Sequence, residues 1–304
     1  MFDNSDGPSR ICLGTAQLGM DYGIANQLGR PDDAQCHRLL SGALERGVFC
    51  WDTAGSYGDA EVRIGEFLAN GHHRDQVRIV SKLGNPPTDL PDTGLRQWVT
   101  QEIDRTLCRL GVEKLAGWLI HDARLVNRYG AALWDAMNAQ VQRGVTHRIG
   151  VSVYDEQEFQ QALAQPSPLA IQLPLNLFDQ RAQQAGLLQE SAGRNDTVYA
   201  RSTLLQGILA MRPMDIPDKI CQLAVPLQQL QTMLRHWGTT PMDVALPFVL
   251  GMDGVDFAVV GVDSLEQLDE NLDRASRSMP ADLIAELSQA FANLPVELLE
   301  PRRW

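Results

Sequence analysis

Short runs of apolar, strand-forming residues alternate with helical patterns along the whole chain. Eight such runs occur, at residues 11–14, 48–52, 77–82, 117–121, 147–152, 170–174, 197–202 and 256–261. In chain order they read ICLG, VFCWD, VRIVSK, GWLIH, HRIGVS, AIQLP, TVYARS and DFAVVG. Eight strands that alternate with helices are what a (β/α)8 barrel requires, so the pattern predicts an α/β fold of the TIM-barrel class.

The stretches between these runs carry helix signals. Residues 31–47 offer two aspartates that can cap a helix, a leucine-rich face and a terminal glycine, and residues 95–111 and 264–275 repeat apolar positions at helical spacing. The segment after Ser202 is longer than one barrel unit. It predicts a loop and an extra helix over the mouth of the barrel, with Pro241 at a helix start. Residues 280–295 predict a final amphipathic helix.

The length of the chain does not decide the number of domains, but the search for linkers does. A chain of 304 residues could hold one barrel or two smaller domains. No Pro/Gly/Ser-rich linker, charge block or internal repeat divides the sequence, so residues 1–304 are predicted to form a single barrel domain. With 44% hydrophobic and 21% charged residues, the composition is that of a globular protein with a large core.

The net charge and the absence of targeting signals limit the classes of binding partner and the location expected for this protein. The formal charge of −12 repels nucleic acid and anionic membrane surfaces, so a small-molecule partner is expected, and an anionic substrate would need a local basic pocket. No export signal or membrane-spanning run occurs, which predicts a cytoplasmic protein. The five cysteines are scattered without a C-x-x-C pair, as expected for reduced core thiols. The sequence leaves the oligomeric state open.

Four titratable residues stand at or just after the ends of successive strands. The second, third and fourth runs end at Asp52, Lys82 and His121, and Tyr57 lies in the loop after the second run. The carboxyl ends of parallel barrel strands meet at one mouth, where barrel enzymes place their catalytic groups. A tyrosine donates a proton poorly near neutral pH unless a neighbour such as a buried lysine stabilises the phenolate. Each residue alone would suit a structural role, but together they predict catalysis.

Three motifs around these residues resemble the aldo-keto reductase superfamily: WDTAGSYGDAE at 51–61, IVSKLG at 79–84 and LIHD at 119–122. The resemblance covers nearly the whole chain. It implies a (β/α)8 barrel with a catalytic tetrad of Asp52, Tyr57, Lys82 and His121, and no metal. It also implies hydride transfer between a nicotinamide and a carbonyl or alcohol carbon, with Tyr57 as general acid and base. In that scheme Lys82 lowers the pKa of Tyr57, Asp52 holds Lys82, and His121 orients the carbonyl.

The same resemblance implies a bound nicotinamide cofactor, NADP or NAD. Its cofactor-binding positions correspond here to Gly14, Thr15, Ser152, Gln172, Arg201, Ser202, Gly261, Asp263, Ser264, Gln267 and Asn271. Gln172 is expected to bind the carboxamide, Gly261 and Ser264 to approach phosphate, and Gln267 and Asn271 to meet the adenosine end.

Three positions depart from the family pattern. Val153 stands where an Asn is usual, and Arg201 stands where a Tyr usually stacks on the nicotinamide. An arginine can also stack on a ring, but it adds a positive charge near the reactive ring or the substrate. Asp263 stands where some family members carry a basic residue toward the 2′-phosphate of NADP, which makes NAD credible, whereas Arg274 and family habit favour NADP. The choice of cofactor stays open.

The sequence also suggests a class of substrate. The stretches at 13–31, 200–209 and 259–268 look most similar to bacterial members found with surface-polysaccharide or sugar-metabolism genes. This suggests a small polar substrate, with sugar-derived carbonyl compounds among the candidates, bound by Tyr22, Trp51 and Asp122. The alternative is a non-catalytic, nicotinamide-binding regulatory barrel. A metal-dependent barrel hydrolase is disfavoured because no H-x-H strand motif occurs.

Overall fold

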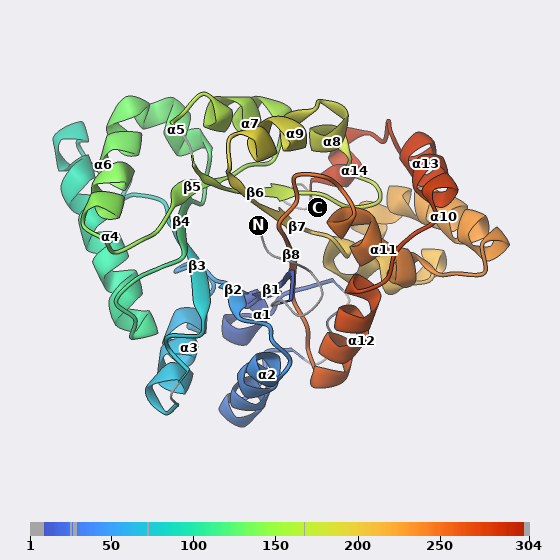
Figure 1. Ribbon diagram of the computed structural model, residues 1–304, viewed down its shortest axis with the longest axis horizontal. Coiled ribbons are helices and arrows are strands. Elements are labelled where there is room, and N and C mark those ends of the chain that lie inside the picture. The colour runs from blue at the N-terminus through green and yellow to red at the C-terminus, as the bar shows by residue number, and fades with distance from the viewer. Residues whose placement is uncertain (1–8, 25, 27–28, 72, 167, 301–304) are drawn as a thin grey trace.

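The computed structural model describes residues 9–300 except 25, 27, 28, 72 and 167. Its eight parallel strands close into one barrel in chain order (Figure 1). They are β1 (Ile11–Gly14), β2 (Cys50–Asp52), β3 (Arg78–Leu83), β4 (Gly117–Ile120), β5 (Ile149–Ser152), β6 (Ala170–Pro174), β7 (Thr197–Arg201) and β8 (Phe257–Val260). All eight predicted strands are present, and the predicted (β/α)8 barrel is confirmed.

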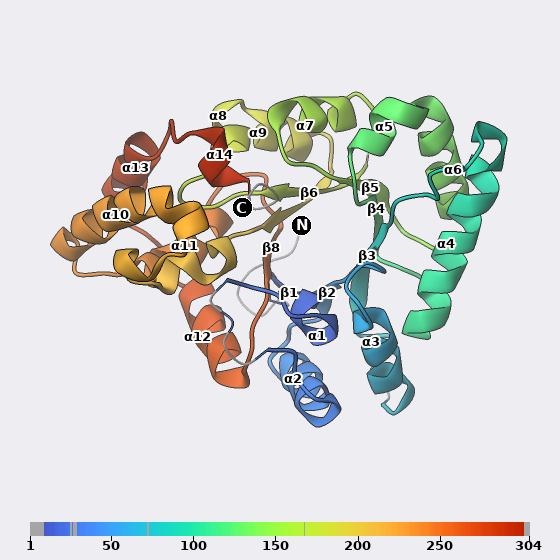
Figure 2. The ribbon, with the colours of Figure 1, turned by 180° about the vertical axis from the view of Figure 1, so that it is seen from behind.

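Helices surround the barrel in both views (Figures 1 and 2). They are α1 (Ala16–Gly19), α2 (Asp33–Glu45), α3 (Ala60–Ala69), α4 (Leu95–Leu110), α5 (Arg124–Tyr129), α6 (Ala131–Gln142), α7 (Glu156–Leu163), α8 (Arg181–Gln184), α9 (Leu187–Gly193), α10 (Ala224–His236), α11 (Pro241–Leu250), α12 (Leu265–Ala275), α13 (Ala281–Ala290) and α14 (Val296–Leu299). Short 3-10 turns are η1 (Asp92–Gly94), η2 (Leu205–Ala210), η3 (Pro213–Asp215) and η4 (Asp218–Leu223). None of the described helices is long and apolar enough to cross a membrane.

The predicted helix signals act as expected. The Asp32 side chain accepts a hydrogen bond from Gln35 N, and the Gln35 side chain accepts one from Asp32 N, so a capping box opens α2. Gly111 ends α4 in the left-handed conformation at φ 63°. Pro241 occupies the first turn of α11, as predicted.

For the long segment after β7, the prediction of a loop over the mouth is confirmed, but the predicted position of the extra helix is wrong. Leu204 and residues of η2 line a cavity at the barrel mouth, as expected of a covering loop. The extra helix α10 instead lies at the periphery, beside α11 in both views (Figures 1 and 2). The single domain over residues 1–304 stays a prediction.

Strand pleating sorts side chains between the barrel interior and the surrounding helices. The interior holds a small buried cluster made of Cys12, Cys50, Val80, Leu119, Ala170 and Tyr199. Alternate residues of a strand point to the same face. The positions two residues further on, Gly14, Asp52, Lys82, His121, Gln172 and Arg201, therefore form the next layer toward the carboxyl edge. Every one of them is a predicted site residue.

Close strand packing also explains a glycine in the barrel wall. A Cβ atom at Gly150 of β5 would lie 1.6 Å from the backbone oxygen of Ala170 on β6. No side chain fits there, so the β5–β6 pairing requires glycine. This pairing places Ser152 directly beside Gln172 at the mouth.

Candidate active site

A buried ion pair lies at the centre of the mouth. Lys82 Nζ donates to Asp52 Oδ1 at 2.6 Å and to the backbone oxygen of Thr53 at 2.9 Å. Gln172 Nε2 donates to the same Asp52 oxygen at 2.7 Å. The side chains of Lys82 and Asp52 are 0% and 5% exposed, so each charge depends on the other for compensation.

Tyr57 lies next to this pair, at the cavity wall. Lys82 Nζ is 5.0 Å from the centroid of the Tyr57 ring. Burial raises the pKa of Tyr57, and although the Lys82 ammonium opposes this rise, the net pKa is above its ordinary value. Lys82 therefore acts on the pKa of Tyr57 in the expected, lowering direction, but burial outweighs it. Burial also lowers the pKa of Lys82, but Asp52 and Tyr57 outweigh it and leave that pKa raised.

His121 is a neutral imidazole in this setting. Burial, followed by the charges of Lys82 and Arg201, lowers its pKa from 6.5 to about 4. Its ring lies edge-on to Tyr57, with centroids 5.8 Å apart, and its Nδ1 is 3.2 Å from Ser56 Oγ. A neutral ring at the cavity wall can hydrogen-bond a carbonyl oxygen without adding charge.

These groups open into a cavity of about 620 Å³, within the size range of small-molecule and cofactor sites. Asp52, Tyr57 and His121 line one end of it, whereas Lys82 is enclosed behind them. The predicted cofactor residues that line it are Gly14, Thr15, Ser152, Gln172, Arg201, Ser202, Gly261, Asp263, Gln267 and Asn271. Tyr22 lines it as well, as predicted for substrate binding.

Besides the enclosed Lys82, three predicted site residues do not line the cavity. Trp51 points outward because it is one residue from the inward Asp52; it is fully buried, and its indole N–H donates to the Val48 oxygen. The Asp122 carboxylate turns away to an ion pair with Arg124. The Ser264 hydroxyl accepts the Gln267 N–H at 3.3 Å and so caps α12.

The cavity has features that fit an elongated polar cofactor. Gly14 and Gly261 line the cavity near the ends of the paired strands β1 and β8, and with no side chain they present only backbone there. A Cβ atom at Gly261 would lie 2.8 Å from Gln17 Oε1 and one at Gly14 would lie 3.3 Å from Gly261 N, so neighbouring groups leave little room for a side chain. Thr203 Oγ1 is buried at the cavity wall without a hydrogen-bond partner in the described structure. A hydroxyl in that state is a ready contact for a bound polar group.

The loop that carries Thr203 is strained. Ser202, Leu205 and Gln206 all have left-handed backbone, at φ values of 57°, 50° and 54°. This conformation is costly for residues other than glycine and is concentrated at functional sites. Ser202 and Gln206 line the cavity and Leu205 does not, so part of the cavity wall is formed by residues with strained backbone.

Sequence reasoning missed several lining residues, among them Gln17, Tyr154, Thr203 and Glu270. Tyr154 follows Ser152 by two positions, a spacing that would place it on the same face if the strand continued. The Arg201 guanidinium lies over the Tyr154 ring, 4.0 Å from its centroid, and Arg201 Nη2 donates to Val153 O at 3.0 Å. Two of the three positions that depart from the family pattern, Val153 and Arg201, thus contact one another.

The other end of the cavity is acidic. Burial raises the pKa of Asp263, whose backbone N–H donates to Gln267 Oε1. Arg274 is already paired, with Glu270 at 3.0 Å and with Asp243 at 3.5 Å. Its charge is therefore largely compensated where the adenosine end of a cofactor is expected.

The fold and the cavity define a (β/α)8 barrel with a polar site at the carboxyl ends of its strands, where barrel enzymes act. The profile of the Aldo/keto reductase family matches residues 10–291, and the chain belongs to this family. It is 24% identical to the uncharacterized oxidoreductase YrpG of Bacillus subtilis, over 97% of this chain and 96% of the relative. It is also 24% identical to the L-glyceraldehyde 3-phosphate reductase of Escherichia coli K12, over 83% and 82% of the two chains.

Solved structures agree on the fold. A crystal structure of a Pseudomonas aeruginosa protein named as an aldo-keto reductase superposes with a TM-score of 0.66 at 21% identity, over 88% of this chain and 89% of that one. Family membership and the named relatives support an oxidoreductase.

Proposed function

We propose that this protein is a nicotinamide-dependent oxidoreductase that interconverts a carbonyl and an alcohol, with Tyr57 as the general acid and base. The observation that carries the proposal is the enclosed Lys82–Asp52 pair, whose ammonium lies beside the Tyr57 ring at the cavity wall. A buried lysine with a raised pKa is a permanent positive charge, suited to stabilising a phenolate as it forms.

The roles of the residues follow from their charge states. A bound nicotinamide would supply or accept the hydride. Neutral His121 hydrogen-bonds the carbonyl oxygen, and Tyr57, kept protonated by its raised pKa, passes its proton to the developing alkoxide. Lys82 stabilises the phenolate that remains, and Asp52 keeps Lys82 charged and in place. The reverse reaction uses the same groups in the opposite sense.

For the cofactor we favour NAD over NADP. Asp263 at the cavity wall would repel a 2′-phosphate, and Arg274 is held by two carboxylates. A carboxylate can instead accept a hydrogen bond from a ribose hydroxyl, as in other dinucleotide sites. Gly14, Gly261 and Thr203 would hold the rest of the dinucleotide through bare backbone and a hydroxyl.

The substrate we propose is a small polar carbonyl compound, with sugar-derived aldehydes as the first candidates. Three phenols and an arginine line or flank the cavity at the catalytic end, and a relative carries the name L-glyceraldehyde 3-phosphate reductase. Bulky apolar ketones turned over in preference to small sugar aldehydes would contradict this choice.

The first experiment titrates the purified protein with NADH and with NADPH, followed by nicotinamide fluorescence, and then adds an aldehyde panel. Wild type should bind NADH and oxidise it with at least one aldehyde. Tyr57→Phe should bind NADH as wild type does and lose turnover by at least about 100-fold. Tyr129→Phe is the matched control, because the Tyr129 hydroxyl is buried on α5 without a hydrogen-bond partner in the described structure. Bound NADH that no carbonyl oxidises would favour a regulatory barrel instead.

A further inference from the structure

Among the residues that the structure describes, one positive charge at the catalytic end of the cavity has no carboxylate partner. Lys82 and Asp52 neutralise each other, and the low pKa of His121 leaves it uncharged near pH 7. Tyr22 and Tyr57 have raised pKa values because of burial, so both phenols stay neutral. Arg201 is the remaining charge.

Among the described residues, Arg201 makes no ion pair with a carboxylate. Its contacts are with neutral groups: Val153 O at 3.0 Å, Ser202 Oγ at 3.5 Å and the face of the Tyr154 ring. The other arginine that lines the cavity, Arg274, has two carboxylate partners.

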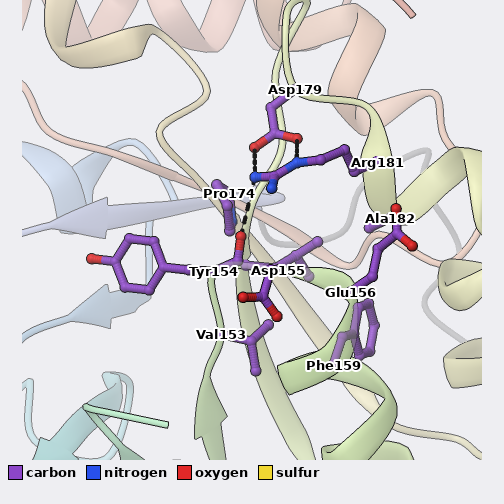
Figure 3. Close-up of a pocket in the computed structure, with 10 residues that line it drawn as sticks. Val153, Tyr154, Asp155, Glu156, Phe159, Pro174, Asp179, Arg181 and Ala182 are labelled. Atoms are coloured by element: carbon purple, nitrogen blue, oxygen red, sulfur yellow. Dashed lines mark hydrogen bonds and ion pairs between the residues drawn. The ribbon is translucent and has the colours of Figure 1, made fainter. Parts of the chain in front are cut away.

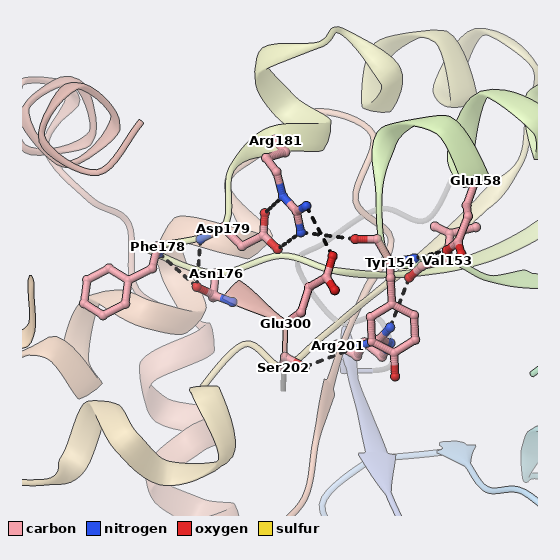
Figure 4. Close-up of polar contacts among 10 residues, drawn as sticks. All are labelled: Val153, Tyr154, Glu158, Asn176, Phe178, Asp179, Arg181, Arg201, Ser202 and Glu300. Atoms are coloured by element: carbon pink, nitrogen blue, oxygen red, sulfur yellow. Dashed lines mark hydrogen bonds and ion pairs between the residues drawn. The ribbon is translucent and has the colours of Figure 1, made fainter. Parts of the chain in front are cut away.

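Arg201 is also held in a fixed position. Figure 4 shows its side chain beside the Tyr154 ring at the end of β7. The Tyr154 backbone is tied at both ends, since its N–H donates to Glu158 Oε2 at 2.6 Å and its oxygen accepts from Arg181 Nη2 at 3.1 Å. Figure 3 shows the Arg181 guanidinium paired with Asp179 above the Tyr154 backbone, with the Tyr154 ring pointing away from this pair. The ring that supports Arg201 is thus anchored to the barrel wall.

A guanidinium with spare N–H donors can bind carboxylate or phosphate oxygens, with two parallel hydrogen bonds where the geometry allows. Within the described part of the chain, the Arg201 side chain donates one hydrogen bond from Nη1 and one from Nη2. Its charge also lowers the pKa of His121. Because His121 and Tyr57 are the groups proposed to face the carbonyl, an anion on Arg201 would be part of the same small molecule.

We infer that the physiological substrate is an anionic carbonyl compound, whose carboxylate or phosphate group is bound by Arg201 while its carbonyl faces Tyr57 and His121. This inference rests on the proposed function and adds the charge of the substrate to it. It also gives the acidic protein the local basic site that an anionic substrate needs.

The test compares kcat/KM for charged and neutral substrates that carry the same aldehyde group. Succinic semialdehyde is paired with its methyl ester, and glyceraldehyde 3-phosphate with glyceraldehyde, so that the two pairs separate a carboxylate from a phosphate. Wild type should prefer the anionic member of at least one pair by about 10- to 100-fold, the worth of hydrogen bonds to a charged group. Arg201→Gln should reduce that ratio to about 1, and Arg201→Lys should retain part of it because the charge stays but the planar fork is lost.

Two controls separate a local from a general effect. Arg105→Gln removes one positive charge from the exposed face of α4 and should leave the ratio as in wild type. The Kd for NADH, measured by fluorescence, should change less than about twofold in Arg201→Gln; a larger loss would assign Arg201 to the cofactor and overturn the inference. If Arg201→Gln does not fold, inhibition of the wild-type enzyme by small anions still tests the inference. Butyrate or inorganic phosphate should inhibit reduction of the neutral aldehydes competitively, and no inhibition by either would contradict the inference.

Failure of this inference differs from failure of the proposed function. Equal kcat/KM values for anionic and neutral partners in an active enzyme would refute the role of Arg201 alone. No oxidation of NADH or NADPH with any of the four aldehydes would refute the oxidoreductase proposal, and this inference with it.

Discussion

Asp52→Asn probes the buried ion pair with almost no change in side-chain size. The variant leaves the Lys82 ammonium, which is 0% exposed, without the carboxylate that now lies 2.6 Å away. Removing one partner of a buried pair costs about 3–5 kcal/mol, because the remaining charge stays desolvated. The asparagine oxygen can still accept a hydrogen bond from Lys82, so we expect about 3 kcal/mol loss in the free energy of unfolding, measured by urea denaturation near pH 7.

The pH dependence provides a second, independent check. In wild type the folded-state pKa of Lys82 lies above 10.5, so its contribution to stability persists up to that pH and is lost only above it. In Asp52→Asn, burial is no longer opposed by the carboxylate, and the pKa of Lys82 should fall below 10.5. The folded variant then binds fewer protons than the unfolded chain, so its free energy of unfolding should rise with pH between about 7 and 10.

A double-mutant cycle identifies the cause. Asp52→Asn combined with Lys82→Met removes the unpaired charge as well as its partner, and it should recover at least about half of the lost stability. The reasoning is refuted if Asp52→Asn lies within about 1 kcal/mol of wild type, or if its stability does not change between about pH 7 and 10.

Three further predictions concern single positions. His121 has a folded pKa of about 4 against 6.5 unfolded, so stability should fall as pH drops from about 6.5 to 4; His121→Gln should flatten this loss, and equal pH profiles would contradict it. Gly150→Ala should lose at least about 3 kcal/mol in urea denaturation, since its Cβ would lie 1.6 Å from Ala170 O, whereas the uncrowded Gly193→Ala should gain up to about 1 kcal/mol. Asp263→Arg should shift the ratio of Kd values toward NADPH by about tenfold, and an unchanged ratio would refute the assigned role of Asp263.

Much of the barrel could be read from the sequence because each strand is a short apolar run and each helix carries its own end signals. The capping box at Asp32 and the glycine after α4 are local features, and local sequence preferences generally agree with the folded structure. The same holds for the site residues at strand ends. Asp52 ends β2, Lys82 lies one residue before the end of β3, and His121 directly follows β4. Parallel strands of a barrel all present their carboxyl ends at one mouth.

Pleating could have corrected one error from the sequence alone. Trp51 and Asp52 are neighbours in β2, so they must point to opposite faces, and only one of them can reach the cavity. The ion pair of Asp122 with Arg124 could not be predicted from pleating, because Asp122 lies beyond the end of the strand and its contact depends on the side-chain conformation.

Charge states and pairings required the tertiary structure. The raised pKa of Tyr57 is a balance between burial and the Lys82 charge, and neither quantity is visible in a sequence. Likewise, Arg201 and Arg274 are the same residue type, yet carboxylates surround one and neutral groups surround the other. The sequence by itself determined the barrel and the residues at its mouth, since periodicity and strand order are properties of the chain. Only the folded structure decided which charges stay free, because that depends on contacts between residues far apart along it.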